Sequence, residues 1–285
     1  MKKRVLLIGV GLIGGSLALS IKKNENVHIV GADINIEEMR VAMMHSVIDE
    51  QADDVKKAAE MADYIILATP VEETANWIHV LSKWTLKQNV VITDVGSTKA
   101  AVMEAAFLLK EKGVTFIGGH PMAGSHQSGA SNARADLFYE ARYMLTPFED
   151  ENPQKIDALM QLLAPTQAHF VFIDAITHDQ VTGVISHLPH VIATSLVRQV
   201  KGYSAKNTLI TEMAAGGFRD LTRIASSSPH MWRDILKQNR YMLLALLDDW
   251  MKEMEQVKSL LEKGDSHELF HYFSDAKQFR DSLHV

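Results

Sequence analysis

Short apolar runs alternate with amphipathic stretches through the first part of the chain. The runs are rich in β-branched and aromatic residues, which is typical of buried strands. They lie at residues 4–8, 27–31, 64–68, 89–93, 114–117, 143–146 and 169–173. Most are separated by helical stretches, such as residues 98–112 and 154–163. This alternation predicts a mainly parallel, doubly wound α/β sheet of the Rossmann type, which binds ligands beyond the carboxyl ends of its strands.

Only helical patterns follow Asp174. We therefore expect two domains, an α/β domain over residues 1–174 and an all-α domain over residues 175–285. The first predicted helix covers residues 176–200, with a kink at Pro189. A second is predicted over residues 207–225.

Capping signals mark the last two predicted helices. Ser228-Pro229 suits a helix start, and the pattern then continues to a stop at Gly264. Asp265 and Glu268 have the spacing of a capping box and begin the final helix. The long helix carries more apolar residues than one thin face can bury. We therefore expect a homodimer formed through the helical domain.

The composition narrows the class of protein. The chain has 285 residues, 47% of them apolar and 22% charged, as in soluble globular proteins. A net charge of −6 without a basic block argues against a nucleic-acid partner. The absence of Cys excludes disulfides and a thiol nucleophile, and it fits a cytoplasmic protein. No apolar segment is long enough to span a membrane, and glycines interrupt the N-terminal stretch that imitates a secretory signal.

A glycine-rich loop follows the first predicted strand and opens a helix. We expect its residues Gly9, Gly11, Leu12, Ile13 and Gly14 to bind a dinucleotide. Gly9 allows a tight turn, Gly11 lets the backbone approach the pyrophosphate, and Gly14 lets helix and strand pack closely. Backbone N–H groups at the helix start then face the phosphates. The alternative is a tight turn that binds no phosphate.

Residues at the ends of the next strands extend this site. Asp33 would accept hydrogen bonds from the ribose hydroxyls and would repel a 2′-phosphate. No Arg or Lys follows it before Arg40, so NAD is favoured over NADP. Thr69 and Pro70 follow another strand and are expected to line the same cleft.

His120 is the strongest candidate for proton transfer. It directly follows a predicted strand, and an imidazole with a pKa near ~6.5 suits proton removal from an alcohol as hydride leaves. The alternative is a turn histidine bonded to the backbone. Ser97 either orients the His120 ring, binds substrate, or caps the helix that begins near Thr98.

A polar stripe is predicted on the first helix of the second half. Asp179, Gly183, Ser186 and His190 fall within a narrow arc at about 100° per residue. Gly183 leaves room for a ligand beside the other three side chains. The alternative is a solvated polar face.

Two more histidines, His178 and His187, fall on the flanks of this stripe. His187 and His190 diverge by about 60° around the helix. No acidic residue shares their spacing, so we expect no metal site.

Arg219 and Arg223 are four residues apart, hence on one face of a helix. Guanidinium is permanently charged and matches a carboxylate bidentately. Without a ligand, an acid such as Asp179 or Asp220 would serve as counter-ion. The alternative is a pair of surface arginines.

Six segments, taken together and in order, carry a family resemblance. They are Gly9-x-Gly-x-x-Gly14, Asp94-Val-Gly-Ser97-x-Lys99, Gly119-His120-Pro-Met-x-Gly124, His178-Asp179, Ser186-His-Leu-Pro-His190 and Gly217-Phe-Arg-Asp-x-Thr-Arg223. Each is unspecific alone, but the ordered set resembles the prephenate dehydrogenase family, which includes arogenate dehydrogenases. The resemblance covers nearly the whole chain.

The resemblance implies NAD-dependent oxidative decarboxylation of prephenate to 4-hydroxyphenylpyruvate, a step of tyrosine biosynthesis. It implies that His120 binds the C4 hydroxyl of prephenate and takes its proton, with Ser97 positioning both. It implies that Arg223 holds the ring carboxylate and pairs with Asp179 when the site is empty. Further implied cleft residues are Ser125, Ser186, His190 and, near the pocket, Trp232. Arg219 either binds the side-chain carboxylate or braces the fold.

Two departures from the family pattern bear on regulation and substrate. Members often carry a small C-terminal regulatory domain, whereas this chain ends at Val285. We expect that regulation to be absent or the chain to be cut short. His126 stands where an acid is frequent in relatives. An acid there would suit the ammonium group of arogenate, so His126 favours prephenate as substrate.

Three alternatives stay open. The first is an arogenate-using enzyme of the same family. The second is a 3-hydroxyacid dehydrogenase, which usually depends on a lysine of the helical domain. The third is a non-catalytic NAD-sensing protein, which would keep residues 9–33 but need neither His120 nor Arg223.

Overall fold

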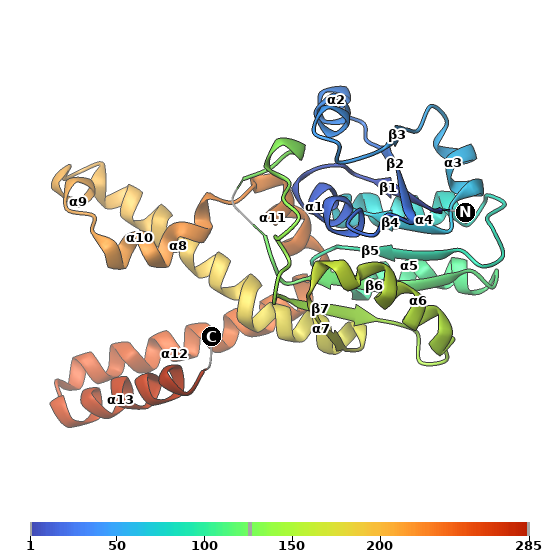
Figure 1. The fold of residues 1–285 in the computed structure, drawn as a ribbon. Helices are drawn as coiled ribbons and strands as arrows, with labels where there is room; N and C mark the ends of the chain where they lie inside the picture. Colours follow the sequence, from blue (N-terminus) through green and yellow to red (C-terminus); the bar gives the residue numbers. More distant parts are fainter. Residues whose placement is uncertain (1, 125–126, 284–285) are drawn as a thin grey trace. The chain divides into compact units, whose positions relative to one another are not determined.

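The computed structural model describes residues 2–124 and 127–283. One eight-stranded sheet organises its N-terminal part, with the strand order β3-β2-β1-β4-β5-β6-β7-β8 (Figure 1). The strands are β1 (Lys3–Ile8), β2 (Val27–Ala32), β3 (Glu50–Gln51), β4 (Tyr64–Leu67), β5 (Val91–Asp94), β6 (Thr115–Pro121), β7 (Arg142–Thr146) and β8 (His169–Phe172). Neighbours are parallel except β6 and β7. All seven predicted strands are confirmed. The unpredicted β3 is an exposed edge strand of 2 residues, too short to leave an apolar pattern.

Helices cover both faces of this sheet (Figure 1). They are α1 (Leu12–Ile21), α2 (Ile36–Met44), α3 (Val55–Met61), α4 (Val71–Leu81), α5 (Ala100–Lys110) and α6 (Pro153–Leu163). Leu17 of α1 and Leu159 of α6 belong to one buried cluster with β-strand side chains. Ile78 of α4 and Val102 of α5 belong to a second cluster, on the opposite face. The predicted doubly wound Rossmann-type fold is therefore confirmed.

The part of the chain described after β8 contains helices and turns without further strands. The helices are α7 (Ala175–Thr182), a π-helix (Gly183–His187), α8 (Leu188–Ser204), α9 (Leu209–Glu212), α10 (Gly216–Thr222), a 3₁₀ turn (Arg223–Ser226), α11 (Pro229–Gln238), α12 (Arg240–Lys263) and α13 (Ser266–Ser282). The predicted all-α character of this half is confirmed.

The first predicted helix of this half differs from expectation, because its middle is a π-helix. Pro189 follows this segment and has no N–H to donate to the carbonyl of Ile185. A π-turn holds one residue more than an α-turn, so the wheel position of later residues shifts. Val184 and Ile185 are consequently 47% and 60% exposed, while His187 is 1% exposed. His178, which precedes the π-helix, is 0% exposed. Both histidines that were predicted to flank the polar stripe are therefore buried.

Two other helix predictions also need correction. Residues 207–225 form α9, α10 and a 3₁₀ turn instead of one helix, since α10 begins at the Gly216-Gly217 pair. The long helix after Ser228 is broken at Asn239 into α11 and α12. Its predicted stop is confirmed, because Gly264 has a φ of 67°. The final capping prediction holds too, since Asp265 accepts hydrogen bonds from two N–H groups of α13.

The chain divides into two compact units, Met1–Asn239 and Arg240–Val285. The first unit extends past the sheet because α7 packs on α5 and α11 packs on α4. This division does not fall near residue 174, so the domain boundary expected there stays a prediction.

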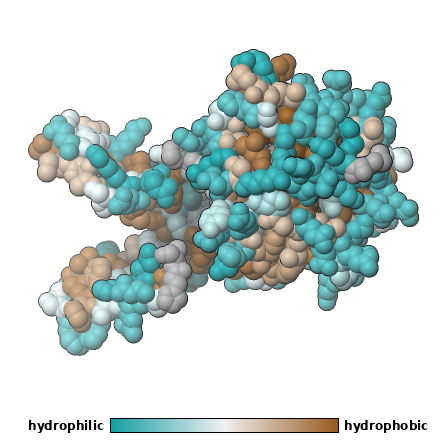
Figure 2. Space-filling view, in the orientation of Figure 1, coloured by the Kyte–Doolittle hydropathy of each residue, from teal (hydrophilic) through white to brown (hydrophobic). Residues whose placement is uncertain are grey.

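The second unit is a hairpin of α12 and α13 with apolar patches on its surface (Figure 2). Its exposed apolar side chains include Leu244, Met251, Met254, Leu261, Phe270, Phe273 and Phe279. Within the described residues, no helix is long and apolar enough to cross a membrane. The exposed apolar side chains of this hairpin agree with the expectation of a protein partner.

Candidate active site

The glycine-rich loop has the geometry of a nucleotide cradle. Gly9 has a φ of 95°, and a Cβ there would lie 2.4 Å from the carbonyl oxygen of Ala68. A Cβ on Gly14 would lie 2.1 Å from the carbonyl oxygen of Gly9. No atom lies within 4 Å of a Cβ placed on Gly11, so the backbone at the start of α1 is open to a ligand. Two glycines thus permit the tight packing, and the third leaves room for a pyrophosphate.

The other predicted nucleotide residues lie beside this loop at the carboxyl ends of neighbouring strands. Asp33 follows β2, and its carboxylate accepts hydrogen bonds from the N–H groups of Val10 at 3.0 Å and Asn35 at 2.8 Å. Thr69 and Pro70 follow β4, and the Thr69 hydroxyl lies 3.0 Å from that of Thr74. Because β1 pairs with both β2 and β4, all of these residues meet at one edge of the sheet.

Three side chains form a chain of hydrogen bonds at the end of β6. Nδ1 of His120 lies 2.9 Å from Nε2 of His178, and Nδ1 of His178 lies 2.8 Å from Oδ1 of Asp179. An ionised carboxylate can only accept, so a neutral His178 donates from Nδ1 and accepts at Nε2. His120 must then donate from Nδ1. Its Nε2 is left unprotonated, as a general base requires.

Asp179 also caps helix α5. Its two carboxylate oxygens accept hydrogen bonds from the N–H of Lys99 at 2.7 Å and of Ala100 at 2.9 Å. One alternative for Ser97 was to cap this helix. Asp179 caps it instead, because α5 begins at Ala100, three residues after Ser97. The expected ion pair between Asp179 and Arg223 is also wrong. Asp179 is only 5% exposed, and its carboxylate already accepts hydrogen bonds from Lys99, Ala100 and His178.

The ionisation of this chain of side chains follows from burial and its partners. Burial lowers the pKa of His120 well below its usual value, and positive charge on His178 or Lys99 lowers it further. Burial also lowers the pKa of His178, although the bond to Asp179 opposes that effect. Burial would raise the pKa of Asp179, but hydrogen bonds from His178, Ala100 and Lys99 lower it on balance. The resting state is thus two neutral imidazoles on an ionised carboxylate.

A second group of hydrogen bonds reaches Ser97. The side-chain amide of Asn239 lies 3.1 Å from Nδ1 of His187 and donates to the backbone carbonyl of Asp179 at 2.8 Å. The backbone of Ser97 hydrogen-bonds to His187, whose pKa burial lowers to about 4. The Ser97 loop is therefore held by a neutral, buried histidine.

A third group of site residues comprises His190 of α8, Trp232 of α11 and Arg223 of the 3₁₀ turn. The rings of His190 and Trp232 stack with centroids 3.7 Å apart. Nδ1 of His190 donates to the carbonyl of Ser186 at 2.9 Å, so Nε2 of a neutral His190 is unprotonated. Burial lowers the pKa of His190, and the charge of Arg223 lowers it further, which puts that guanidinium nearby. The Trp232 indole N–H is buried and has no protein acceptor among the described residues.

Arg223 and Arg219 are both exposed. Within residues 2–124 and 127–283, neither forms an ion pair. Arg223 lies in the 3₁₀ turn and Arg219 lies in α10, and both of these elements pack on α8. Both expected ligand roles therefore stay predictions. Ser125 and His126 lie outside the described residues.

The predicted polar stripe is not a solvated face. Asp179 and Gly183 are buried, and Ser186 and His190 are half-buried. In the described part of the chain, no group of three or more metal-ligating side chains is arranged to hold a metal ion.

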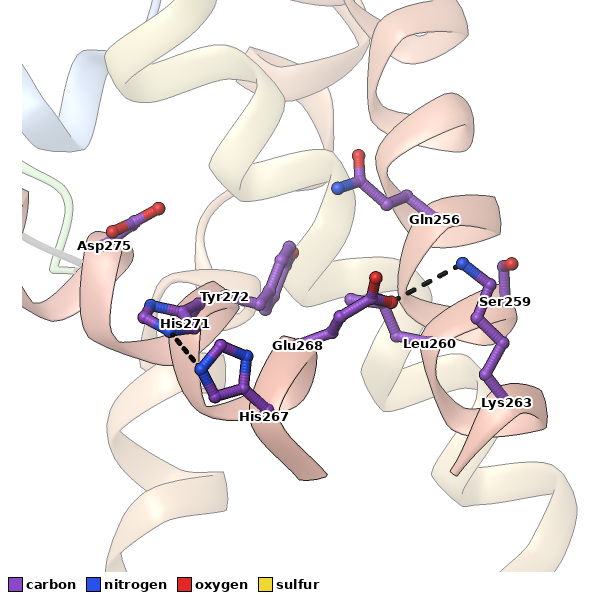
Figure 3. Close-up of a pocket in the computed structure, with 9 residues that line it drawn as sticks. All are labelled: Gln256, Ser259, Leu260, Lys263, His267, Glu268, His271, Tyr272 and Asp275. Atoms are coloured by element: carbon purple, nitrogen blue, oxygen red, sulfur yellow. Dashed lines mark hydrogen bonds and ion pairs between the residues drawn. The ribbon is translucent and has the colours of Figure 1, made fainter. Parts of the chain in front are cut away.

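An open pocket of about 500 Å³ lies elsewhere, on the α12–α13 hairpin (Figure 3). His267, Glu268 and His271 line it, together with Tyr272 and Asp275. None of the predicted site residues is among the residues that line it. The chemistry argued above therefore belongs to the carboxyl edge of the sheet.

Three buried residues complete the site although they were not among the predicted site residues. His187 ends the π-helix, whose extra residue an unbroken α-helix does not predict, and His178 precedes it in α7. Asn239 sits at a helix break inside an apolar pattern. The adjacency of His178 to Asp179 was the one signal in the sequence that pointed to the chain of hydrogen bonds.

The buried histidines predict that stability falls in mild acid. The pKa of His187 is about 4 in the folded protein, against an ordinary value of 6.5. The unfolded chain therefore takes up this proton first. The neutral His187 ring makes its full contribution to the free energy of unfolding above pH 6.5. That contribution is lost as the pH falls toward 4, at about 1.4 kcal/mol per pH unit. His178 and His120 act in the same direction.

Urea unfolding at a series of pH values checks this prediction. A His187→Gln variant should show a shallower loss of stability across that range. His45→Gln, which changes an exposed histidine, should keep the wild-type slope. A wild-type free energy of unfolding that does not change over this range would contradict it.

The glycine-rich loop and Asp33 have the geometry expected of a nucleotide site, and the hydrogen bonds of His120 leave a ring nitrogen unprotonated at the same edge of the sheet. Together they define an NAD-dependent dehydrogenase with a Rossmann-type domain. The family model for the nucleotide-binding domain of prephenate dehydrogenase matches residues 17–172, and the model for its dimerization domain matches residues 174–275. The chain belongs to the prephenate dehydrogenase family.

Individual relatives agree with this assignment. The chain is 45% identical to the prephenate dehydrogenase of Bacillus subtilis (strain 168) over 284 residues, which cover 99% of this chain and 76% of the relative. A crystal structure of prephenate dehydrogenase from Aquifex aeolicus with hydroxyphenyl propionate and NAD+ superposes with a TM-score of 0.90 at 30% identity, covering 98% of both chains. The arogenate dehydrogenase of Synechocystis superposes with a TM-score of 0.82 at 28% identity, covering 98% of this chain and 99% of the other.

Proposed function

We propose that this protein oxidises prephenate with NAD⁺, giving 4-hydroxyphenylpyruvate, CO₂ and NADH. Bound NAD⁺ supplies the hydride acceptor. The residues around it fit this cofactor, since Gly11 leaves the start of α1 open and Asp33 stands at the end of β2. The observation that carries the proposal is the unprotonated Nε2 of His120 beside that nucleotide site.

In the proposed reaction, Nε2 of His120 accepts the proton of the C4 hydroxyl while hydride leaves the same carbon. The positive charge that develops on His120 is then shared through His178 with the ionised Asp179. The C4 carbonyl that forms draws in the electrons of the bond to the ring carboxylate, so CO₂ leaves and the ring becomes aromatic. Those electrons end on the C4 oxygen as a phenolate, which takes back the proton held on His120 to give the phenol and leaves Nε2 unprotonated again.

Substrate carboxylates need a fixed positive charge near His120. Arg223 is exposed and without an ion-pair partner among the described residues, and its charge acts on His190. We assign it as the anchor for the ring carboxylate, with Ser186, His190 and Trp232 beside it. Its free guanidinium supports this role because a surface arginine already paired with an acid could not receive a ligand.

Arg223→Ala is expected mainly to raise KM for prephenate. Loss of one charge-assisted hydrogen-bonding partner corresponds to roughly 1.5–3 kcal/mol, or roughly a 10- to 150-fold rise in KM, with kcat changed less. Steady-state kinetics with varied prephenate measures this. Arg219→Ala, which removes the same charge one helical turn earlier, is the matched comparison. An unchanged KM in Arg223→Ala would sink the anchor assignment.

The choice between prephenate and arogenate is the finer part of the proposal. It rests on His126, because an imidazole does not attract the ammonium group of arogenate as an acid would. The test is to mix the protein with NAD⁺ and each substrate in turn and follow NADH absorbance. A higher kcat/KM for prephenate is expected. A higher value for arogenate would overturn the substrate assignment, and no signal with either would overturn the function.

The proposed assembly is a homodimer formed through the helical half. The match to a dimerization-domain model over residues 174–275 and the exposed apolar side chains of α12 and α13 support it. Light scattering of the purified protein gives the mass, and a monomer at micromolar concentration would contradict the assembly.

A further inference from the structure

We infer that Asn239 is a positioning residue for the proposed reaction, which sets the hydrogen-bonding state of His187 and through it the place of Ser97. The inference rests on the proposed function, and it adds a residue that touches neither substrate nor cofactor. Asn239 lies at the break between α11 and α12 and is 5% exposed. A buried amide at such a break must find partners for both of its N–H groups.

The partners of Asn239 lie before the π-helix and at its last residue. Its Nδ2 donates to the carbonyl oxygen of Asp179, four residues before the π-helix begins, at 2.8 Å. The same Nδ2 lies 3.1 Å from Nδ1 of His187, the last residue of the π-helix. An NH₂ group has two hydrogens, so both contacts are donations. One amide therefore bridges a segment whose wide turn is intrinsically costly and fixes its register.

This bridge decides which nitrogen of His187 carries a proton. Because Nδ1 accepts from Asn239, a neutral His187 must carry its hydrogen on Nε2. That nitrogen is the ring atom left to bond the backbone of Ser97 as a donor. A neutral ring is ensured by burial, which lowers the pKa of His187 to about 4.

The Asn239 amide is also linked to His120, the proposed base, through Asp179. Asp179 receives the Asn239 hydrogen bond on its backbone and orients His178 and His120 with its side chain. Asn239 thus ties the segment that carries Ser97 to the helix that aligns His120. Its loss should change the relative placement of the two groups assigned to the substrate hydroxyl, without removing either of them.

Asn239→Asp is the most direct test, because it replaces the NH₂ group by oxygen at nearly constant volume. The new carboxylate at position 239 would face the carbonyl oxygen of Asp179 and the lone pair on Nδ1 of His187, and both repel it. A proton taken up by His187 would relieve the second repulsion. We expect kcat with prephenate to fall about 100-fold, the loss expected from misplacing a reacting group by about 1 Å. The dissociation constant of NAD⁺ should stay within about twofold of wild type, since the nucleotide loop lies on other strands.

A spectroscopic measurement keeps the inference testable even if that variant folds poorly. Long-range ¹H–¹⁵N NMR of the wild-type protein should show His187 as a neutral ring with hydrogen on Nε2 near neutral pH. In Asn239→Asp, His187 should bind a proton in that range, and kcat should gain a matching pH dependence. A merely structural role for Asn239 would lower stability without moving the His187 signal.

Gln238→Glu provides the matched control. It makes the same change from amide to carboxylate one residue earlier, at a half-buried side chain that makes no hydrogen bond in the described part of the chain. This variant should keep the wild-type kcat and His187 signal. The inference is overturned by a wild-type His187 with hydrogen on Nδ1, by an Asn239→Asp enzyme with wild-type kcat, or by an equal loss in Gln238→Glu. Failure of the wild-type protein to oxidise prephenate would overturn the proposed function instead, whereas the NMR result does not depend on activity.

Discussion

His120→Asn is expected to lower kcat by between about 10²- and 10⁴-fold, the range of a general base. The asparagine amide can occupy the place of Nδ1 and keep a hydrogen bond to His178, so the chain of side chains behind it stays in position. It has no atom in the place of Nε2, and the hydroxyl proton then has no acceptor. Stopped-flow or steady-state formation of NADH measures the loss.

Binding and pH dependence separate this effect from a general disturbance of the site. The dissociation constants of prephenate and NAD⁺ should change little, because neither the anchor nor the nucleotide loop is altered. The pKa of His120 is lowered well below its ordinary value of 6.5, so wild-type kcat/KM should keep its acid limb below that pH. His120→Asn should lose that limb. A loss of kcat below about tenfold would contradict the role of His120 as base.

The nucleotide half of the site could be predicted because its chemistry is local. Gly9, Gly11 and Gly14 follow a buried strand. Close contacts with the same turn or with Ala68 after the adjacent strand require Gly9 and Gly14, and Gly11 leaves the helix start open. Asp33 comes at the end of the next strand, and parallel strands bring their ends together. A pattern in the sequence is enough when the backbone itself forms the site.

The support behind His120 could not be predicted, because it depends on helix register. Periodicity alone treats residues 176–200 as one α-helix, and a π-turn near Pro189 leaves no periodic signal of its own. The extra residue turns His187 into the core and exposes Val184 and Ile185. The tertiary contacts of Asp179 with α5 also outweigh its expected pairing with Arg223, since two N–H groups at a helix start are better partners for a buried carboxylate than an exposed guanidinium.

Asp179→Asn is expected to lower both activity and stability, since Asp179 serves the base and the start of α5 together. The carboxylate accepts hydrogen bonds from His178, Lys99 and Ala100. An amide has one oxygen and a donor in place of the other, so at least one buried N–H group faces another donor. An unsatisfied buried donor costs about 1–3 kcal/mol of unfolding free energy. His178 would also lose the charge that holds its hydrogen on Nδ1, and kcat should fall by about 10²-fold or more.

Asp174→Asn makes the same chemical change at the exposed cap of α7, where the side chain accepts from two N–H groups and, in the described part of the chain, bonds to no histidine side chain. An asparagine caps nearly as well as an aspartate, so this variant should keep kcat and most of its stability.

The pKa of Asp179 is lowered below its ordinary 3.8, so its ionised form stabilises the fold above that pH and ceases to do so as the pH falls through the lowered value. Asp179→Asn should therefore also flatten the acid end of the stability profile, whereas a variant with wild-type kcat would mean that His120 needs no aligned partner behind it.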